Sequence, residues 1–191
     1  QLAMAASRAK NAKSGAARAK RGPLFRAMME NLPFKLTDSQ QKVIDEIIDG
    51  ASAGAQSARL LQGDVGSGKT AVAAAFAAAI CDGGAQCAVL APTEALAGQL
   101  CAQMKKYIPL AEGECLLIKG SMPAAARRKA EASAADGSAR IIAGTQALLS
   151  EKLKFRKLGA VVIDEQQRFG VRQRGRLLAD AAHPHLLMMS A

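Results

Sequence analysis

Aromatic residues are scarce in this chain of 191 residues, which has no tryptophan, one tyrosine and five phenylalanines. Proteins that bind single-stranded nucleic acid without sequence preference stack the bases on aromatic side chains. Because so few such side chains are available, the composition argues against a base-stacking platform. We therefore expect any contact with nucleic acid to be made with phosphates.

Long apolar runs and paired cysteine motifs are also lacking. No segment reaches 18 uninterrupted apolar residues, the length of a membrane-spanning helix, and the N-terminus has no apolar signal-peptide core. The cysteines form no C-x-x-C pair, which argues against a zinc site and favours reduced thiols. We expect a cytoplasmic protein without a membrane segment; the four cysteines are Cys81, Cys87, Cys101 and Cys115.

Acidic residues are absent before Glu30, although the net charge of the whole chain is +10. This basic start fits binding to phosphate backbones, or a solvated linker helix that packs on a neighbouring domain. Its Ala, Arg and Lys content predicts a helical linker, and Gly22-Pro23 separates it from a second short helix over 24–31. The chain starts at Gln1 and stops in an apolar run, so we expect a piece of a longer protein.

Apolar strands alternate with helical patterns along the rest of the chain. A helix with its cap at Thr37 or Asp38 runs to Gly50. The alternation that follows indicates right-handed βαβ units and an α/β fold with a mostly parallel sheet covered by helices on both faces. The predicted strands are 58–62, 86–91, 114–120, 139–144, 159–165 and 184–191, and the predicted helices are 69–83, 94–108, 123–137 and 145–153.

The stretch "GDVGSGKT" matches G-x-x-x-x-G-K-[ST] and lies between a predicted strand and a predicted helix. The glycines let backbone amides point inward at a helix N-terminus, where they bind anions. Lys69 supplies a positive charge to the β- and γ-phosphates of a nucleotide, and the Thr70 hydroxyl is a Mg²⁺ ligand. The predicted nucleotide-binding residues are Gly63, Asp64, Val65, Gly66, Ser67, Gly68, Lys69 and Thr70.

Two acids, Asp164 and Glu165, end the predicted strand over 159–165. In doubly wound sheets, ligands bind beyond the carboxyl ends of the strands, so both acids are expected to face the same phosphates as Lys69. Asp164 would hold Mg²⁺, and Glu165 would orient and polarise the attacking water. The alternative is a capped strand end with solvated acids.

Six segments together resemble the RecG family of bacterial ATP-dependent DNA helicases. They are "LPFKLTDSQQKVIDEI", "LLQGDVGSGKT", "APTEALAGQ", "GTQALL", "VVIDEQQRFGVRQR" and "HPHLLMMSA". The resemblance implies the first RecA-like motor domain, a P-loop NTPase fold, over 33–191. It also implies that residues 1–32 are a basic helical linker from the family's DNA-binding wedge domain.

The resemblance also implies roles for individual residues. Gln40 would read the edge of the adenine base, with Phe34 or Leu36 packing near it. Contacts with DNA phosphates would come from two motifs, which do not read sequence. Ser190 and Ala191 would begin the motif that couples hydrolysis to movement; the implied DNA-binding residues are Pro92, Thr93, Gly144 and Thr145.

One position departs from the family pattern, in which the acidic motif usually reads D-E-Q-H. Here the fourth residue is Gln167, an amide that hydrogen-bonds but does not titrate near neutrality as histidine does. We count Gln167 with Lys69, Asp164 and Glu165 as the catalytic set. The second RecA-like domain, which would supply arginines to the transferring phosphate, is missing, so we expect weak hydrolysis by this chain.

Two other functions fit parts of the sequence. The motor of the transcription–repair coupling factor shares "RFGV" and the glycine-rich loop, but that family usually reads D-E-E-Q where this chain has Gln166 in the third position. A nucleotide-regulated binding module or a small-molecule kinase would need neither the basic arm nor the two phosphate-contacting motifs.

Overall fold

The computed structural model describes residues 3–5, 17–165 and 183–190. Its seven strands form one sheet in the order β1-β2-β7-β6-β3-β5-β4. Every pairing is parallel except that of β1 with β2. The strands are β1 (Ala3–Ala5), β2 (Ala58–Gln62), β3 (Gln86–Leu90), β4 (Cys115–Ile118), β5 (Ile141–Gly144), β6 (Leu158–Ile163) and β7 (His185–Ser190).

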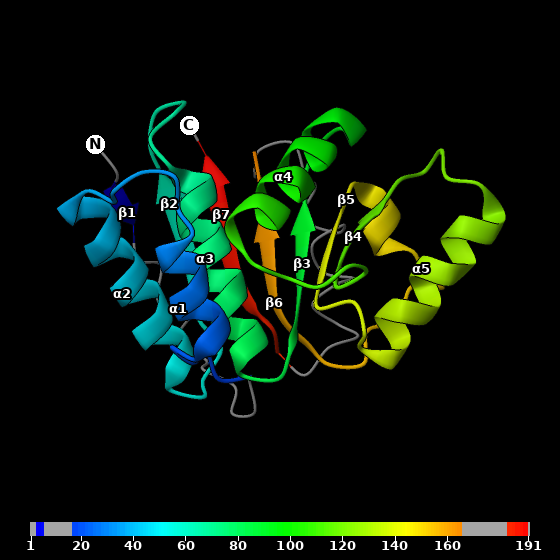
Figure 1. Ribbon diagram of the computed structural model, residues 1–191, viewed down its shortest axis with the longest axis horizontal. Coiled ribbons are helices and arrows are strands. Elements are labelled where there is room, and N and C mark those ends of the chain that lie inside the picture. Colours follow the sequence, from blue (N-terminus) through cyan, green and yellow to red (C-terminus); the bar gives the residue numbers. More distant parts are fainter. Residues whose placement is uncertain (1–2, 6–16, 166–182, 191) are drawn as a thin grey trace.

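Helices pack against both faces of this sheet. Figure 1 shows α1 to α4 over one of these faces. In β3, Cys87 and Val89 belong to the core on the face of α3 and α4, whereas Ala88 and Leu90 belong to the core under α5. This alternation is the two-residue period of a strand buried on both faces. The helices are α1 (Pro23–Glu30), α2 (Asp38–Ser52), α3 (Lys69–Asp82), α4 (Glu94–Tyr107) and α5 (Ala124–Asp136), with a 3₁₀ turn, η1, at Gln146–Leu149.

Helix α3 is the central helix of its layer, and every residue from Ala71 to Cys81 is buried. It packs between the sheet and helices α1 and α2. Its many alanines explain this position, because small side chains let neighbouring backbones approach from all sides. The helix that follows the glycine-rich loop is therefore held on every side.

The residues that precede α2 are built into this layer. The backbone N–H groups of Ala19 and Lys20 donate to the carbonyls of Ala51 in α2 and Ala79 in α3, over 3.2 and 2.9 Å. Phe25 and Met28 of α1 lie in the main core. We call residues 17–30 the N-terminal strap.

The parallel α/β architecture predicted from the sequence is confirmed, and the predicted strands and main helices lie within a few residues of the observed ones. Three local predictions are wrong. Residues 17–22, expected to be helical, have no regular structure. The antiparallel strand β1 was not predicted, and the helix expected over 145–153 is only the turn η1. Residues 6–16 of the predicted linker lie outside the described residues.

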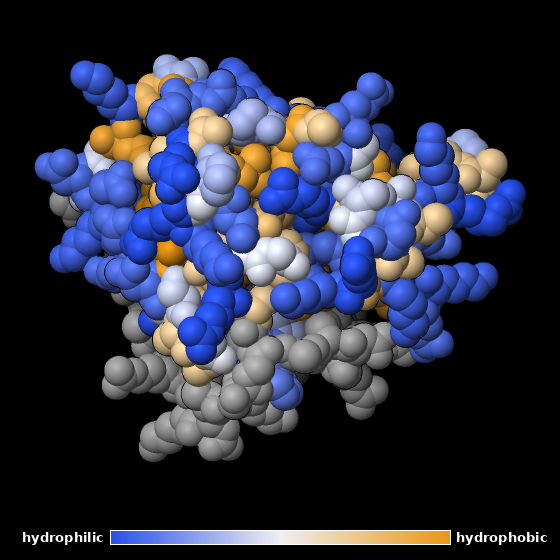
Figure 2. All heavy atoms as spheres, turned by 60° about the horizontal axis from the view of Figure 1, so that its bottom comes forward, coloured by the Kyte–Doolittle hydropathy of each residue, from blue (hydrophilic) through white to orange (hydrophobic). Residues whose placement is uncertain are grey.

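On the face that Figure 2 shows, the described surface is mostly hydrophilic, with small, separate apolar patches. Among the described residues, the large apolar side chains that are exposed are Phe34 and Val65, at 42% and 93%. Both belong to the predicted nucleotide site. No helix in the described part of the chain has both the length and the apolar character required to cross a membrane.

Candidate functional site

The predicted motifs meet at one edge of the sheet, uppermost in Figure 1, because parallel strands end at the same edge. The glycine-rich loop follows β2, and Asp164 follows β6. Strand β7 lies between them and pairs with both. Backbone hydrogen bonds fix the residues that follow these strands: the N–H of Gly63, after β2, donates to the carbonyl of Ser190 in β7, and the N–H of Asp164, after β6, donates to that of Leu90 in β3.

The loop from Gly63 to Gly68 presents its backbone at the N-terminus of α3. Gly66 and Gly68 have φ values of 83° and 86°, a region that residues with a Cβ rarely adopt. No side chain caps α3, and no acidic residue lies in its first turn. The positive end of the helix dipole is therefore directed at a partly exposed loop, which favours binding of an anion there.

Lys69 and Asp164 bring opposite charges to this edge. The Lys69 ammonium donates to the carbonyl oxygens of Gly63 and Asp64, the second over 3.0 Å. Burial raises the pKa of the Asp164 carboxyl, and repulsion from Glu165 adds to this, whereas the Glu165 backbone N–H and the charge of Lys69 act to lower it. The two motifs, 95 residues apart in the sequence, therefore lie within electrostatic reach of each other.

Glu165 adopts a strained backbone conformation directly after Asp164. Its φ is 54°, which is uncommon for a residue that is not glycine. Strain of this kind costs on the order of 1–3 kcal/mol and is concentrated at active sites and switch segments. This feature was not predicted from the sequence, where nothing marks a positive φ at a glutamate.

Gln40 connects the start of α2 to the glycine-rich loop. Its side-chain oxygen accepts from the N–H of Thr37 over 2.9 Å, and Thr37 in turn caps Gln40, so the two form a capping box. Its amide nitrogen donates to the carbonyl of Ser67 over 2.8 Å. The structure thus brings Gln40 to the loop; whether it also reads a base stays a prediction.

An open groove of about 520 Å³ is formed by the end of α1, the segment before α2 and Gln41 of α2. Phe34 lines it, and its ring packs edge-on against Tyr107 with the ring centres 6.1 Å apart. Met29 and Glu30 of α1 also line the groove, and the sequence reasoning missed both. The only signal was their position on the predicted helix just before "FKLT"; the full lining is Met29, Glu30, Leu32, Pro33, Phe34, Lys35, Leu36 and Gln41.

The two motifs expected to contact DNA also meet at this edge. Pro92 and Thr93 follow β3, and Thr93 caps α4 by accepting from the N–H of Leu96 over 3.3 Å. Gly144 ends the neighbouring strand β5, and its carbonyl accepts from the N–H of Ala91 over 2.9 Å. A Cβ at Gly144 would lie 2.6 Å from the carbonyl oxygen of Ile118, so this position requires glycine.

The side chains of Thr93 and Thr145 reach the surface here. Thr93 is exposed and Thr145 is half-buried, on adjacent loops. The predicted residue Gln167 lies outside the described residues, as do Gln166 and Ala191. The structure therefore brings together the glycine-rich loop, Gln40, Asp164 and Glu165, with the two DNA motifs farther along the same edge.

Comparison with known proteins identifies the class. The sequence model of DEAD/DEAH box helicases matches residues 37–191. The chain therefore belongs to the DEAD/DEAH box helicase family.

Within this class, the chain is similar to ATP-dependent DNA helicases named RecG. It is 43% identical over 170 residues to RecG of Synechocystis sp., and these cover 89% of this chain and 20% of the relative. It is 45% identical over 178 residues to RecG of Mycobacterium bovis, with 86% and 24% covered. The resemblance seen in the motifs is thus confirmed, and the chain spans about a quarter of the length of these relatives.

Solved structures agree. The chain superposes on the structure of RecG bound to a three-way DNA junction with a TM-score of 0.77 at 32% identity, covering 92% of this chain and 24% of the other. It also superposes on the DEAD-box helicase Mss116 bound to single-stranded RNA with a TM-score of 0.67 at 19% identity, with 88% and 38% covered, which shows the shared fold.

Proposed function

We propose that this chain is the ATP-binding half of a RecG-like DNA helicase motor that acts on branched DNA, such as replication forks and Holliday junctions, in recombination and repair. The observation that carries the proposal is the meeting of Lys69 and Asp164 at one edge of a parallel sheet. The named relatives and the RecG junction structure support the choice of substrate.

The glycine-rich loop fits a nucleoside triphosphate. An uncapped helix N-terminus, left-handed glycines and a lysine at the first helical position together favour a polyphosphate. In the structure, Lys69 bonds to carbonyls of its own loop. On binding, the ammonium would exchange these carbonyls for phosphate oxygens, which are stronger acceptors because they are charged.

Asp164 and Thr70 fit a magnesium ion bound with the triphosphate. A half-buried carboxylate whose pKa is raised by burial gains most from a nearby cation, and hydroxyl and carboxylate oxygens are ligands that Mg²⁺ accepts. The bound ion would neutralise charge on the transferring phosphoryl group. Glu165 would orient the attacking water, and Gln167 would hydrogen-bond to the γ-phosphate or to the coupling motif.

The groove beside Phe34 fits the base of the nucleotide. Phe34 is exposed at the groove although it is apolar, so a bound base would cover it. Gln40 would read the edge of adenine after exchanging its bond to Ser67 for one to the base. Through this exchange, binding of the base would release the carbonyl of Ser67 in the phosphate loop from its bond to Gln40.

DNA would bind through its phosphates at Pro92, Thr93, Gly144 and Thr145. These residues share the sheet edge with the nucleotide motifs, so a change there can be passed to the DNA contacts. The missing second RecA-like domain would close over the nucleotide, and the wedge domain would precede residues 1–32. A cytoplasmic location goes with this function.

Two alternatives have less support. A transcription–repair coupling motor shares the glycine-rich loop, but the relatives described above are RecG proteins. A small-molecule kinase or binding module does not account for the helicase family match over residues 37–191.

Nucleotide binding by the chain tests the first half of the proposal. We expect a fluorescent ATP analogue to bind in a magnesium-dependent manner. Lys69→Ala should weaken binding at least about tenfold, and Lys129→Ala, an exposed lysine on α5, should not change it. Equal binding by both variants would contradict the assignment of the loop.

DNA binding tests the second half. Affinity for forked DNA should fall steeply between about 50 and 200 mM salt, because phosphate contacts release counterions. Phosphate release by the chain alone should stay slow with or without the fork. Fast turnover would show that no second domain is needed and would contradict the division of roles.

A further inference from the structure

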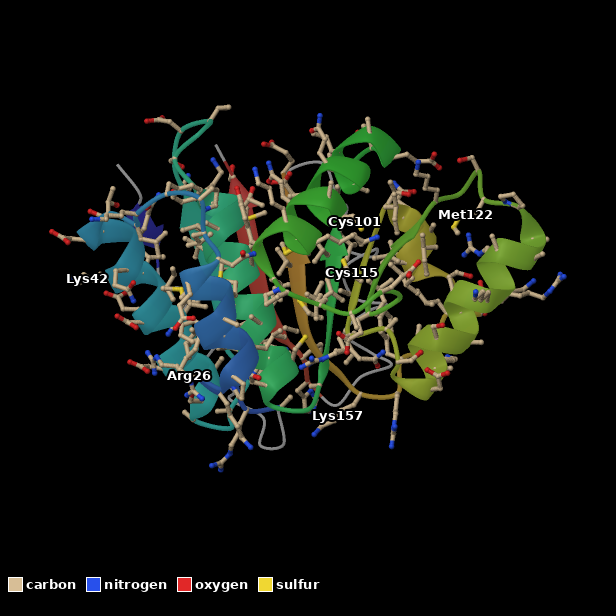
Figure 3. The ribbon with its side chains drawn as sticks, viewed as in Figure 1. Arg26, Lys42, Cys101, Cys115, Met122 and Lys157 are labelled. Atoms are coloured by element: carbon tan, nitrogen blue, oxygen red, sulfur yellow. The ribbon has the colours of Figure 1, made fainter. Side chains whose placement is uncertain are left out.

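We propose that Cys101 and Cys115 form an oxidisable dithiol, a modification site that links α4 to β4 by a disulfide when the protein meets a peroxide. This inference does not depend on the proposed function. Its basis is a contact: the two sulfur atoms lie 3.7 Å apart and share a hydrogen bond, although they are 14 residues apart in the sequence. Figure 3 shows both side chains between α4 and the strands beneath it.

The pair differs from the other two cysteines. All four lie in the same core on one face of the sheet, and the register places Cys87 and Cys115 on either side of Ile141. The sulfurs of Cys81 and Cys87 hydrogen-bond to backbone carbonyls, of Arg140 and Ala88. Among the described residues, only Cys101 and Cys115 have a recorded sulfur–sulfur contact.

The electrostatic environment makes Cys101 the nucleophile and Cys115 the residue that then attacks its oxidised sulfur. Donation of the Cys115 proton lowers the pKa of the Cys101 thiol, and Lys105, one turn along α4, adds to the effect. The same hydrogen bond raises the pKa of the Cys115 thiol. Burial raises the pKa of Cys81 to about 12 and that of Cys87 well above its ordinary value, so neither supplies a thiolate near neutral pH.

The chemistry balances with hydrogen peroxide as the oxidant. The Cys101 thiolate attacks one peroxide oxygen, the O–O bond breaks, and hydroxide leaves and takes a proton to become water. The sulfenic acid on Cys101 is then attacked by the Cys115 sulfur, which loses its proton, and a second water leaves. The sulfurs must approach from 3.7 Å to about 2.05 Å, which needs only small side-chain and helix movements.

The bridge would fix α4 at a second point. The Glu94 carboxylate at the start of α4 already accepts two hydrogen bonds from Ser121, in the loop after β4, over 3.2 and 2.8 Å. A disulfide from Cys101 to Cys115 would tie the middle of the same helix to the start of the same strand. Helix and strand would then be joined at both ends of β4.

Thiol counting after oxidation tests the inference in the wild-type chain. The folded protein is treated with hydrogen peroxide, the peroxide is removed, and the protein is unfolded in denaturant because all four cysteines are buried. It is then alkylated with a maleimide and weighed by mass spectrometry. We expect the number of alkylated thiols to fall from four to two and to return to four after dithiothreitol. The rate should rise with pH, because the thiolate of Cys101 is the attacking form. An unchanged count, or the loss of a single thiol, would overturn the proposal.

Peptide mapping identifies the linked residues. Cleavage after Lys105, Lys119, Glu94 and Glu114 with trypsin and Glu-C separates Cys101, in 95–105, from Cys115, in 115–119, and leaves Cys81 and Cys87 together in 70–94. We expect 95–105 linked to 115–119. A disulfide from either peptide to 70–94 would contradict the proposed pairing of Cys101 with Cys115.

Matched variants complete the test. Cys101→Ala and Cys115→Ala should each abolish the link, whereas Cys81→Ala, another buried cysteine of the same core, should retain it. Circular dichroism checks that each variant is folded. If a variant is unfolded, the peptide mapping of the wild-type chain still tests the proposal.

Discussion

At the scale of single residues, Gly68 joins the backbone of the proposed phosphate loop to Gln40. Its φ is 86°, and a Cβ there would lie 2.3 Å from the Gln40 side-chain nitrogen. Gly84 has a φ of 74° but nothing within 4 Å of the Cβ position. The two glycines therefore separate the effect of backbone strain from the effect of displacing Gln40.

We predict that Gly68→Ala and Gly84→Ala each lower the free energy of unfolding by about 1 kcal/mol, because each forces alanine into the left-handed region. Only Gly68→Ala should weaken binding of an ATP analogue, by about tenfold or more. Urea unfolding and a fluorescence titration measure the two effects. Equal binding by the two variants would show that the Gln40 contact does not shape the loop.

Asp164 gives a prediction with a definite sign. Because its folded pKa is raised, ionisation of this carboxyl destabilises the fold; the penalty is absent below the unfolded pKa and complete above the folded one. Asp164→Asn should therefore increase the free energy of unfolding at pH 7, and the gain should vanish as the pH falls through the unfolded pKa, near 4. Any phosphate release should disappear in the same variant.

Asp136 is the control with the opposite sign. Hydrogen bonds from Ser138 lower the pKa of its exposed carboxyl, so its ionised form is favoured in the fold. Asp136→Asn should leave unchanged or decrease the stability at pH 7 and should leave nucleotide binding unchanged. A gain in stability from both substitutions would mean that removal of any acid from this protein is stabilising.

At the scale of secondary-structure elements, Asp82 ties the end of α3 to the beginning of α1. Its carboxylate accepts from the N–H groups of Leu24 and Phe25 over 3.1 and 2.8 Å. The residue at the N-cap position of α1 is Gly22, which has no side chain to do this. The last residue of α3 thus caps the N-terminus of α1, which belongs to the N-terminal strap.

We predict that Asp82→Ala destabilises the protein by about 1 kcal/mol, the usual effect of removing a helix cap. Asp82→Asn should cost less, since an amide oxygen still accepts a hydrogen bond. Amide hydrogen exchange in α1 should increase in the alanine variant. Unchanged exchange there would show that α1 is held by its core contacts alone.

The helices and strands that the sequence predicts well are those whose local pattern agrees with their packing. Helix α3 runs from Lys69 to Asp82 nearly as expected, because the glycine-rich loop marks its start and Gly83 marks its end. In the N-terminal strap, the local pattern and the packing disagree. Its Ala, Arg and Lys content favours helix, but the backbone of Ala19 and Lys20 bonds to Ala51 and Ala79 instead. Such long-range partners leave no local signal, and neither does the pairing of β1 with β2.

The candidate site likewise contains residues that the sequence predicts and residues that it does not. Lys69 and Asp164 are marked by motifs, and the alternation of strands and helices is enough to predict that both lie at one edge of the sheet. The groove lining from α1 is not marked, because Met29 and Glu30 reach the groove only through the packing of α1 on α3. The bond from Gln40 to Ser67 likewise depends on how α2 docks beside the loop.

At the scale of the whole molecule, the strap makes the folding unit longer than the family match. That match begins at residue 37, and the proposed functional boundary lies at residue 33. Yet Phe25 and Met28 are 6% and 0% exposed in the main core. His185 at the start of β7 is fully buried, and its ring bonds to the carbonyl of Ala17 and to the N–H of Ser57. The division at residue 33 stays a prediction about function.

A chain shortened to residues 33–191 should therefore be much less stable than one shortened to 17–191. Burial of a large apolar side chain contributes about 1.5–3 kcal/mol, so the loss of Phe25 and Met28 alone removes about 3–6 kcal/mol. A small domain has only about 5–15 kcal/mol in total. Urea unfolding of both chains measures the difference, and the 17–191 chain controls for the loss of β1. If both chains unfold at the same urea concentration, the strap does not contribute to the stability of the fold. If the 33–191 chain unfolds at a lower concentration, the strap is part of the folding unit. A force applied to the strap would then be transmitted to α3 and to the glycine-rich loop at its start.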